Sequence, residues 1–125
     1  MLINPGPVRT ALIDIDRATE FVGDDVDQFS MLVDLGGFFE NAQVWLPTLS
    51  SEGVASIYAQ RDAAVATVPV QVQTLDDNAT GHFAKATTSG AGGIVITFNN
   101  VNTQYLRVKV AANQSADRSI IVRGC

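Results

Sequence analysis

The sequence predicts an all-β protein: a single antiparallel β-sandwich over residues 1–125, jelly-roll-like, with about eight strands. Apolar and polar residues alternate along many short segments, which is typical of strands that bury one face. Clusters of Gly, Pro, Asn and Asp separate these segments at the spacing found in sandwiches and barrels. No segment keeps apolar residues at helical spacing for three turns, so we expect helix only as single turns, at 17–21 and 61–66.

Four segments show the alternation most clearly. Their expected inward faces are Phe29, Met31, Val33 and Leu35; Val68, Val70 and Val72; Ile94, Ile96 and Phe98; and Leu106, Val108 and Val110. Weaker strands are expected at 8–15, 41–47, 53–60, 81–87 and 118–123, with turns at 4–7, 22–25, 35–37, 75–81, 88–93, 99–102 and 111–117. Pro69 has no amide hydrogen, so its strand is expected at the edge of a sheet.

The two halves of the chain differ in charge. Residues 1–60 carry two bases and nine acids, giving -7, whereas residues 61–125 carry six bases and four acids, giving +2, so the net charge is -5. This difference has two interpretations: complementary contacts between copies, or ordinary solvation of a surface. The acidic balance argues against nucleic-acid partners, which need clustered Lys and Arg. No membrane partner is expected either, because no apolar run approaches the ~20 residues that span a bilayer and the first residues lack a secretory signal.

Few residues could carry chemistry. His82 is the only histidine, which excludes a metal site built on paired histidines and leaves a nucleophile with one candidate base. Acidic residues 14–27 do not fit an EF-hand loop, because Thr19 stands where the loop needs Gly and Asp25 where it needs Glu. Gly90–Gly93 precede a strand rather than a helix, which indicates a turn and not a phosphate cradle. We therefore expect no enzyme, no cofactor and no metal site.

The sequence leaves two alternatives for the environment of Trp45. The inward phase of segment 41–47 is Ala42, Val44 and Leu46. Trp45 then falls on the polar face with Gln43, where it would anchor a sugar ring or a neighbouring subunit. The alternative is that both faces of the strand are covered and Trp45 is core. A place in the core is the default expectation for Phe38, Phe39, Tyr58 and Tyr105.

The closing pattern "YLRVKVAANQSADRSIIVRG" is a strand with an aromatic residue and Arg, a loop of small polar residues, and a strand that ends in "VRG". It resembles the C-terminal segment of small structural proteins of tailed bacteriophages, over about the last fifth of the chain. The resemblance transfers no functional residue. It implies a non-enzymatic protein made in the host cytoplasm and carried on the virion surface. It also implies a role as a capsid decoration or cement protein that binds and stabilises the lattice of the major capsid protein.

The charge difference and Trp45 together predict a homo-oligomer, as a trimer, in which the acidic region of one copy faces basic residues of the next. Exposed ion pairs contribute only about 0.2–1 kcal/mol each, so apolar contacts would have to supply the affinity. The residues expected at contacts are Trp45, Tyr105, Arg107, Lys109, Arg118 and Arg123. Cys125, the only cysteine, cannot pair within a monomer and is expected to fray at the chain end and to be dispensable.

Two other functions stay open. A carbohydrate-binding or tail- or fibre-associated β-sandwich module would explain exposed aromatic residues such as Trp45 and Tyr58. A hydrolase would rest on His82 alone. The place of the aromatic residues separates the two leading functions: aromatic residues along one concave surface favour sugar binding, whereas aromatic and Arg side chains at subunit contacts favour assembly.

Overall fold

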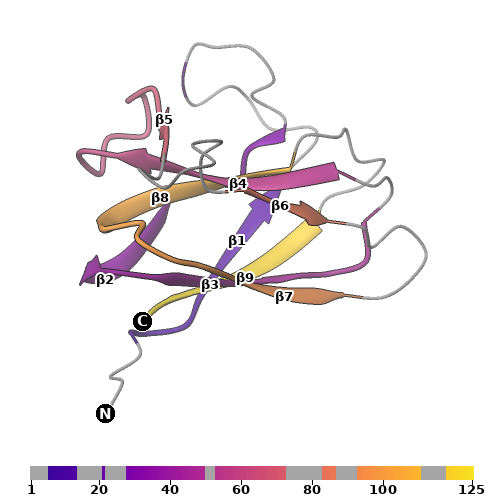
Figure 1. The fold of residues 1–125 in the computed structure, drawn as a ribbon. Coiled ribbons are helices and arrows are strands. Elements are labelled where there is room, and N and C mark those ends of the chain that lie inside the picture. The colour runs from indigo at the N-terminus through magenta and orange to yellow at the C-terminus, as the bar shows by residue number, and fades with distance from the viewer. Residues whose placement is uncertain are drawn as a thin grey trace, which may run out of the picture.

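The computed structural model describes residues 6–13, 21, 28–49, 53–72, 83–86, 93–110 and 118–125, which form two facing antiparallel sheets (Figure 1). The strands are β1 (Arg9–Ile13), β2 (Val33–Phe39), β3 (Ala42–Leu46), β4 (Gly53–Gln60), β5 (Val70–Gln71), β6 (Phe83–Ala86), β7 (Ile94–Phe98), β8 (Thr103–Val110) and β9 (Arg118–Gly124). Within these ranges no helix has the length and apolar character needed to cross a bilayer.

The strand order is that of a jelly roll. One sheet, here called sheet A, has the order β1-β9-β3-β7, and the other, sheet B, has the order β2-β8-β4-β5 with β6 also paired to β4. The pairs β1/β9, β2/β8 and β3/β7 join strands from the two halves of the chain, and consecutive strands mostly alternate between the sheets. This arrangement confirms the predicted fold, with the short strands β5 and β6 sharing one edge of β4.

The core lies between the sheets and follows the predicted alternation along most strands. Leu106, Val108 and Val110 of β8 are fully buried against residues of sheet A. The predicted inward residues of β3 and Phe98 of β7 are buried as well, and Ile94 and Ile96 pack against this core. Because successive residues of a strand point to opposite faces, the apolar phase alone assigns these side chains to the interior.

Segment 28–35 departs from the prediction. Val33 and Leu35 of β2 face the core, but Phe29 does not. In the pairing with β8, Val33 lies opposite Leu106 and Phe29 opposite Lys109, so the four steps from 33 to 29 match three steps in β8. A slip of one residue turns a side chain to the other face of the sheet. Phe29 is therefore buried on the outer face of sheet B, and Met31 is partly exposed.

Segment 67–74 also departs from the prediction. Among its described residues only Val70 and Gln71 form a strand, which lies at the edge of sheet B as Pro69 requires. Val68 and Val70 are exposed, Pro69 is buried, and only Val72 packs against the core. The predicted inward face is therefore wrong for Val68 and Val70 and right for Val72. The strand is short, since β5 pairs only with Tyr58 and Ala59 at the end of β4.

Candidate functional site

A bulge in β2 creates the main feature of the surface. Asp34 lies opposite Tyr105 and Phe39 opposite Thr103, so five steps along β2 match two along β8 and three residues are extra. Gly36, within this bulge, has a φ of 86°, a conformation that L side chains rarely adopt. The predicted turn at 35–37 is thus a bulge inside a strand. Its result is that Phe38, expected in the core, is 79% exposed.

The bulge is held by hydrogen bonds from three directions. The side-chain oxygen of Asp34 accepts from the Gly36 amide at 2.8 Å and from the Gln104 amide group at 3.2 Å. Arg9 donates its Nε–H to the Asp34 carbonyl at 2.8 Å. The bond from Gly36, followed by that from Gln104, lowers the pKa of the Asp34 carboxyl, because both bonds favour its charged form. The bulge therefore has a defined shape.

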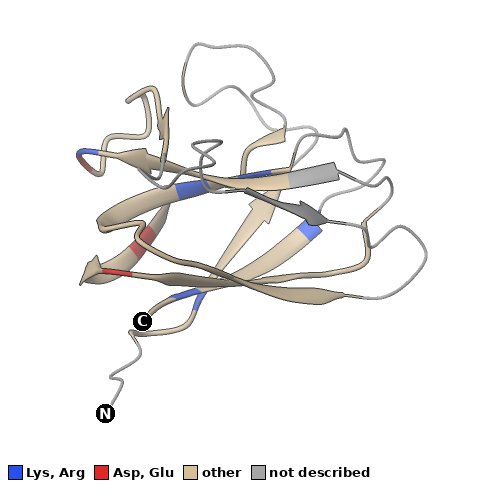
Figure 2. Ribbon diagram, viewed as in Figure 1, with Lys and Arg blue, Asp and Glu red and all other residues tan. Residues whose placement is uncertain are grey.

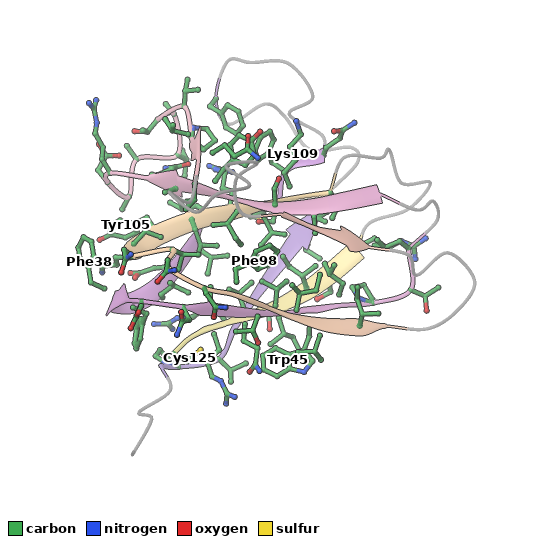
Figure 3. The ribbon with its side chains drawn as sticks, viewed as in Figure 1. Phe38, Trp45, Phe98, Tyr105, Lys109 and Cys125 are labelled. Atoms are coloured by element: carbon green, nitrogen blue, oxygen red, sulfur yellow. The ribbon has the colours of Figure 1, made fainter. Side chains whose placement is uncertain are left out.

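Phe38 and Tyr105 line one hollow at the same end of the sandwich (Figure 3). This Phe38 hollow has a volume of about 450 Å³. Its lining residues come from β2, β4, the loop after β4, β5, β8 and the turn before β8: Phe38, Ala59, Gln60, Arg61, Val70, Val101, Asn102, Thr103, Gln104 and Tyr105. Asn102 is exposed and has a φ of 47°, as expected in the predicted turn at 99–102. The hollow combines two aromatic rings with amide and guanidinium groups.

A second hollow adjoins the first. This Val68 hollow has a volume of about 570 Å³ and is lined by Ala59, Arg61, Ala64, Ala66, Thr67, Val68 and Val70. Ala59, Arg61 and Val70 line both hollows. Val65, Val68 and Val70 are exposed, so with Phe38 they place four of the large exposed apolar side chains at this end of the molecule.

Hydrogen bonds between its own residues stabilise the loop that lines the Val68 hollow. Asp62 accepts from the Thr67 hydroxyl at 2.7 Å and from the Ala64 amide at 3.1 Å, and these bonds lower the pKa of its carboxyl. Thr67 also donates its amide to the Ala64 carbonyl at 3.0 Å, which closes a turn in place of the single helical turn expected at 61–66. Gln60 donates its side-chain amide to the carbonyls of Asp62 and Ala64. The wall of the hollow is therefore a closed loop.

Arg107 binds Gln60, which lines the Phe38 hollow, and the loop that lines the Val68 hollow. Its side chain is fully buried on the outer side of sheet B, where it donates to the Gln60 side-chain oxygen at 2.7 Å and to the carbonyls of Ser30 and Val65 at 3.1 and 3.2 Å. Its guanidinium carbon lies 5.0 Å from the centre of the Phe21 ring. The alternation correctly placed Arg107 on the other face of β8 from Leu106 and Val108. However, the guanidinium that was predicted to contact another copy forms its hydrogen bonds within the chain.

Three of the other predicted contact residues, Trp45, Arg123 and Lys109, lie on two opposite faces. Trp45 and Arg123 lie together on the outer face of sheet A, with the guanidinium carbon 5.4 Å from the ring centre and a bond of 3.1 Å from Arg123 to Gln43. Lys109 lies on the outer face of sheet B, over the rings of Phe29 and Tyr58. Figure 3 shows Trp45 and Lys109 on opposite sides of the sandwich. One flat contact cannot include all of these residues.

Trp45 lies neither in the core nor fully in solvent. It is half-buried on the polar face of β3, as the alternation predicted, and opposite Ile121 and Val95 in the ladders of sheet A. Arg118 begins β9, opposite Ile13. Fraying was expected at Cys125, but its backbone exchanges two hydrogen bonds of 3.0 Å with Asn41 and so extends the β3/β9 ladder.

Several predicted positions lie outside the described residues. They are His82, turn residues 4–5, the turns at 75–81 and 111–117, residues 87–92 and the acidic segment 14–27 apart from Phe21. In the part of the chain that the structure describes, no three His, Cys, Asp or Glu side chains come together where they could hold a metal ion. Phe38 is the site residue that the sequence failed to single out, and Gly36 beside it was the available signal for a bulge.

The chain is similar in structure to several solved proteins, but it matches no known family. Neither a protein family nor a curated protein matches the sequence. Among solved structures, the CBM32 domain of AlyQ in complex with 4,5-unsaturated mannuronic acid is 18% identical, with a TM-score of 0.43 over 75% of this chain and 67% of that one. Chitosan-binding module 2 of a chitosanase/glucanase from Paenibacillus sp. IK-5, in complex with chitotriose, is 15% identical, with a TM-score of 0.46 over 90% of each chain.

A further structural likeness covers only part of the other protein. It is to CapF, a capsular polysaccharide assembling protein from Staphylococcus aureus, at 10% identity and a TM-score of 0.34, over 97% of this chain and 25% of that one. At these identities and TM-scores, none of the likenesses bears on a binding site of this chain.

Proposed function

We propose that the protein is a non-catalytic carbohydrate-binding module that holds a sugar chain in the Phe38 hollow. The observation that carries this proposal is that Phe38, 79% exposed, lines a concave surface together with Tyr105. An aromatic ring left in water at the mouth of a hollow is a place for a ligand, because large exposed apolar groups cost free energy unless a partner covers them. The flat C–H face of a sugar ring is such a partner.

The polar part of the lining suits sugar hydroxyls. Each hydroxyl both donates and accepts, and the amides of Asn102 and Gln104 offer both kinds of atom at the rim. Arg61, whose side chain is 88% exposed, adds further donors. Gln60 contributes no polar atom to a ligand, because its amide is already bonded to Arg107 and to the loop carbonyls. The hollow thus has apolar contact on one side and exchangeable polar groups on the other.

Truncation of Phe38 tests the proposal. A phenylalanine side chain presents about 200 Å², of which 79% is exposed here. A sugar that covers about half of that surface gains about 2 kcal/mol at ~25 cal/mol/Å², or roughly 30-fold in Kd. Phe38→Ala should therefore lose about 30-fold in affinity for whichever polysaccharide retards the wild-type protein in affinity electrophoresis. Thermal unfolding should change little, because the ring makes few contacts.

Trp45→Ala is the matched control, since it removes an aromatic ring from the opposite sheet. It should leave polysaccharide retention unchanged. Retention that depends on Trp45 and not on Phe38 would contradict the assignment of the site. Wild-type protein that no polysaccharide in a broad panel retards would contradict the function itself.

A virion structural role is the second candidate, and the outer face of sheet A favours it. Trp45 of β3 lies between Ile121 of β9 and Val95 of β7, its partners in the two ladders. Ile121 and Val95 are exposed. Such an apolar row suits contact with another protein. Co-sedimentation of the protein with undecorated capsid shells, lost in Trp45→Ala and kept in Phe38→Ala, would support decoration of a capsid. The expected trimer would be seen in sedimentation of the protein alone.

A further inference from the structure

We infer that the sugar chain carries acetamido groups and that one of them occupies the Val68 hollow. This inference rests on the proposed function, because it needs a sugar ring on Phe38. The two hollows share Ala59, Arg61 and Val70, so a ligand seated on Phe38 reaches the Val68 hollow without leaving the protein surface. The site therefore accepts more than one sugar unit.

The lining of the Val68 hollow selects an apolar group over a hydroxyl. Five of its seven lining residues have apolar side chains: Ala59, Ala64, Ala66, Val68 and Val70. Thr67 also lines it, but the Thr67 hydroxyl already donates to Asp62 at 2.7 Å. Away from Thr67 and Arg61, a sugar hydroxyl placed against these apolar side chains would lose water without gaining a partner, which costs free energy. A methyl group placed here gains from burial instead.

Arg61 supplies the polar half of the match. It lines both hollows, and its exposed guanidinium can donate to a carbonyl oxygen at the junction. An acetamido group has a methyl group to bury and a carbonyl oxygen that accepts a hydrogen bond. The lining of the Val68 hollow and Arg61 together provide both partners.

The charges at this end favour a neutral group over an acidic one. The Nε of Arg61 lies 3.6 Å from a carboxylate oxygen of Asp62, which offsets its charge. Asp34, Glu40 and Asp62, the acids of the described part of the chain, all lie toward this end of the sandwich (Figure 2). Arg9, Arg61 and Arg107 lie among these acids, so this end holds no excess of positive charge that would attract a carboxylate or sulfate, and a neutral acetamido group needs none.

Two tetrasaccharides with the same backbone test the inference. Tetra-N-acetylchitotetraose and cellotetraose are both neutral β-1,4-linked chains, and they differ at C2, which carries an acetamido group in one and a hydroxyl in the other. Isothermal titration calorimetry of the wild-type protein should show at least about tenfold tighter binding of the acetylated chain, which corresponds to ~1.4 kcal/mol. Val68→Ser should reduce this preference to about threefold or less by making the wall polar.

Val95→Ser is the matched control, because Val95 is 51% exposed on sheet A and Val68 is 56% exposed in the hollow. It should leave both affinities unchanged.

Equal binding of the two tetrasaccharides, or a preference that survives Val68→Ser, overturns the acetamido inference. In either case the proposed function stands if Phe38→Ala removes the binding of the tetrasaccharides. Binding of neither tetrasaccharide, with Phe38-dependent retention by another polysaccharide, likewise overturns only the inference. Failure of every polysaccharide to bind overturns the proposed function.

Discussion

Replacement of Arg107 by Met should destabilise the protein more than any other single change of a basic residue in the described part of the chain. The buried guanidinium donates to Gln60, to the Ser30 carbonyl and to the Val65 carbonyl, and so ties β4, the segment before β2 and the 61–67 loop to β8. Methionine fills a similar volume but donates no hydrogen bond. The three oxygens would remain where they are and lose their donor.

The cost can be worked from the burial of these oxygens. The bonds to Gln60 and Ser30 are buried, whereas the bond to Val65 is only partly buried, so water can replace Arg107 there. A buried acceptor left without a donor costs about 1–3 kcal/mol, so two cost about 4 kcal/mol. Domains of this kind have about 5–15 kcal/mol of stability in total. At roughly 4 °C per kcal/mol, the melting temperature should fall by about 15 °C.

Urea unfolding followed by circular dichroism measures this loss. Arg123→Met is the control, because the half-buried Arg123 has one bond to Gln43 and its stacking on Trp45, worth together about 1–2 kcal/mol. An Arg107→Met variant that loses no more stability than Arg123→Met would refute the view that Arg107 is an internal brace.

Three further outcomes are expected. A Cβ at position 124 would overlap the ring of Phe39, so Gly124→Ala should cost about 1–3 kcal/mol in urea unfolding, whereas Gly37→Ala, whose Cβ would lie 3.7 Å from that ring, should cost clearly less. Cys125→Ser should leave the melting temperature and the assembly state unchanged, because the chain end is held by backbone bonds to Asn41; a loss of oligomer under non-reducing conditions would instead reveal an intermolecular disulfide. The folded-state pKa of Asp34 lies below its ordinary value of 3.8, so its stabilising effect is present above that pH and is lost as the pH falls through the folded value. The stability difference between wild type and Asp34→Asn, measured by thermal melts from pH 7 to pH 2, should therefore shrink below about pH 4, and a difference that grows there would show the sign to be wrong.

Much of the sandwich was predictable because its signal is local. The period-two pattern of 103–110 assigned Leu106, Val108 and Val110 to one face and Arg107 to the other, and all four lie as assigned. Pro69 predicted an edge strand, since a missing amide hydrogen excludes a central position whatever the rest of the fold does. The alternation also placed Trp45 on the outer face of its strand.

The candidate site was not predictable in the same way, because it depends on pairing between distant segments. Alternation tells which residues share a face, but not whether another segment covers that face or how many residues a neighbouring strand matches. Three extra residues opposite β8 put Phe38 into solvent beside Tyr105, and a slip of one residue put Phe29 on the outer face of sheet B. The sequence by itself thus determined the inward faces of most strands, whereas the tertiary structure alone decided that Arg107 is enclosed and that Phe38 is exposed, since register between strands is a long-range property.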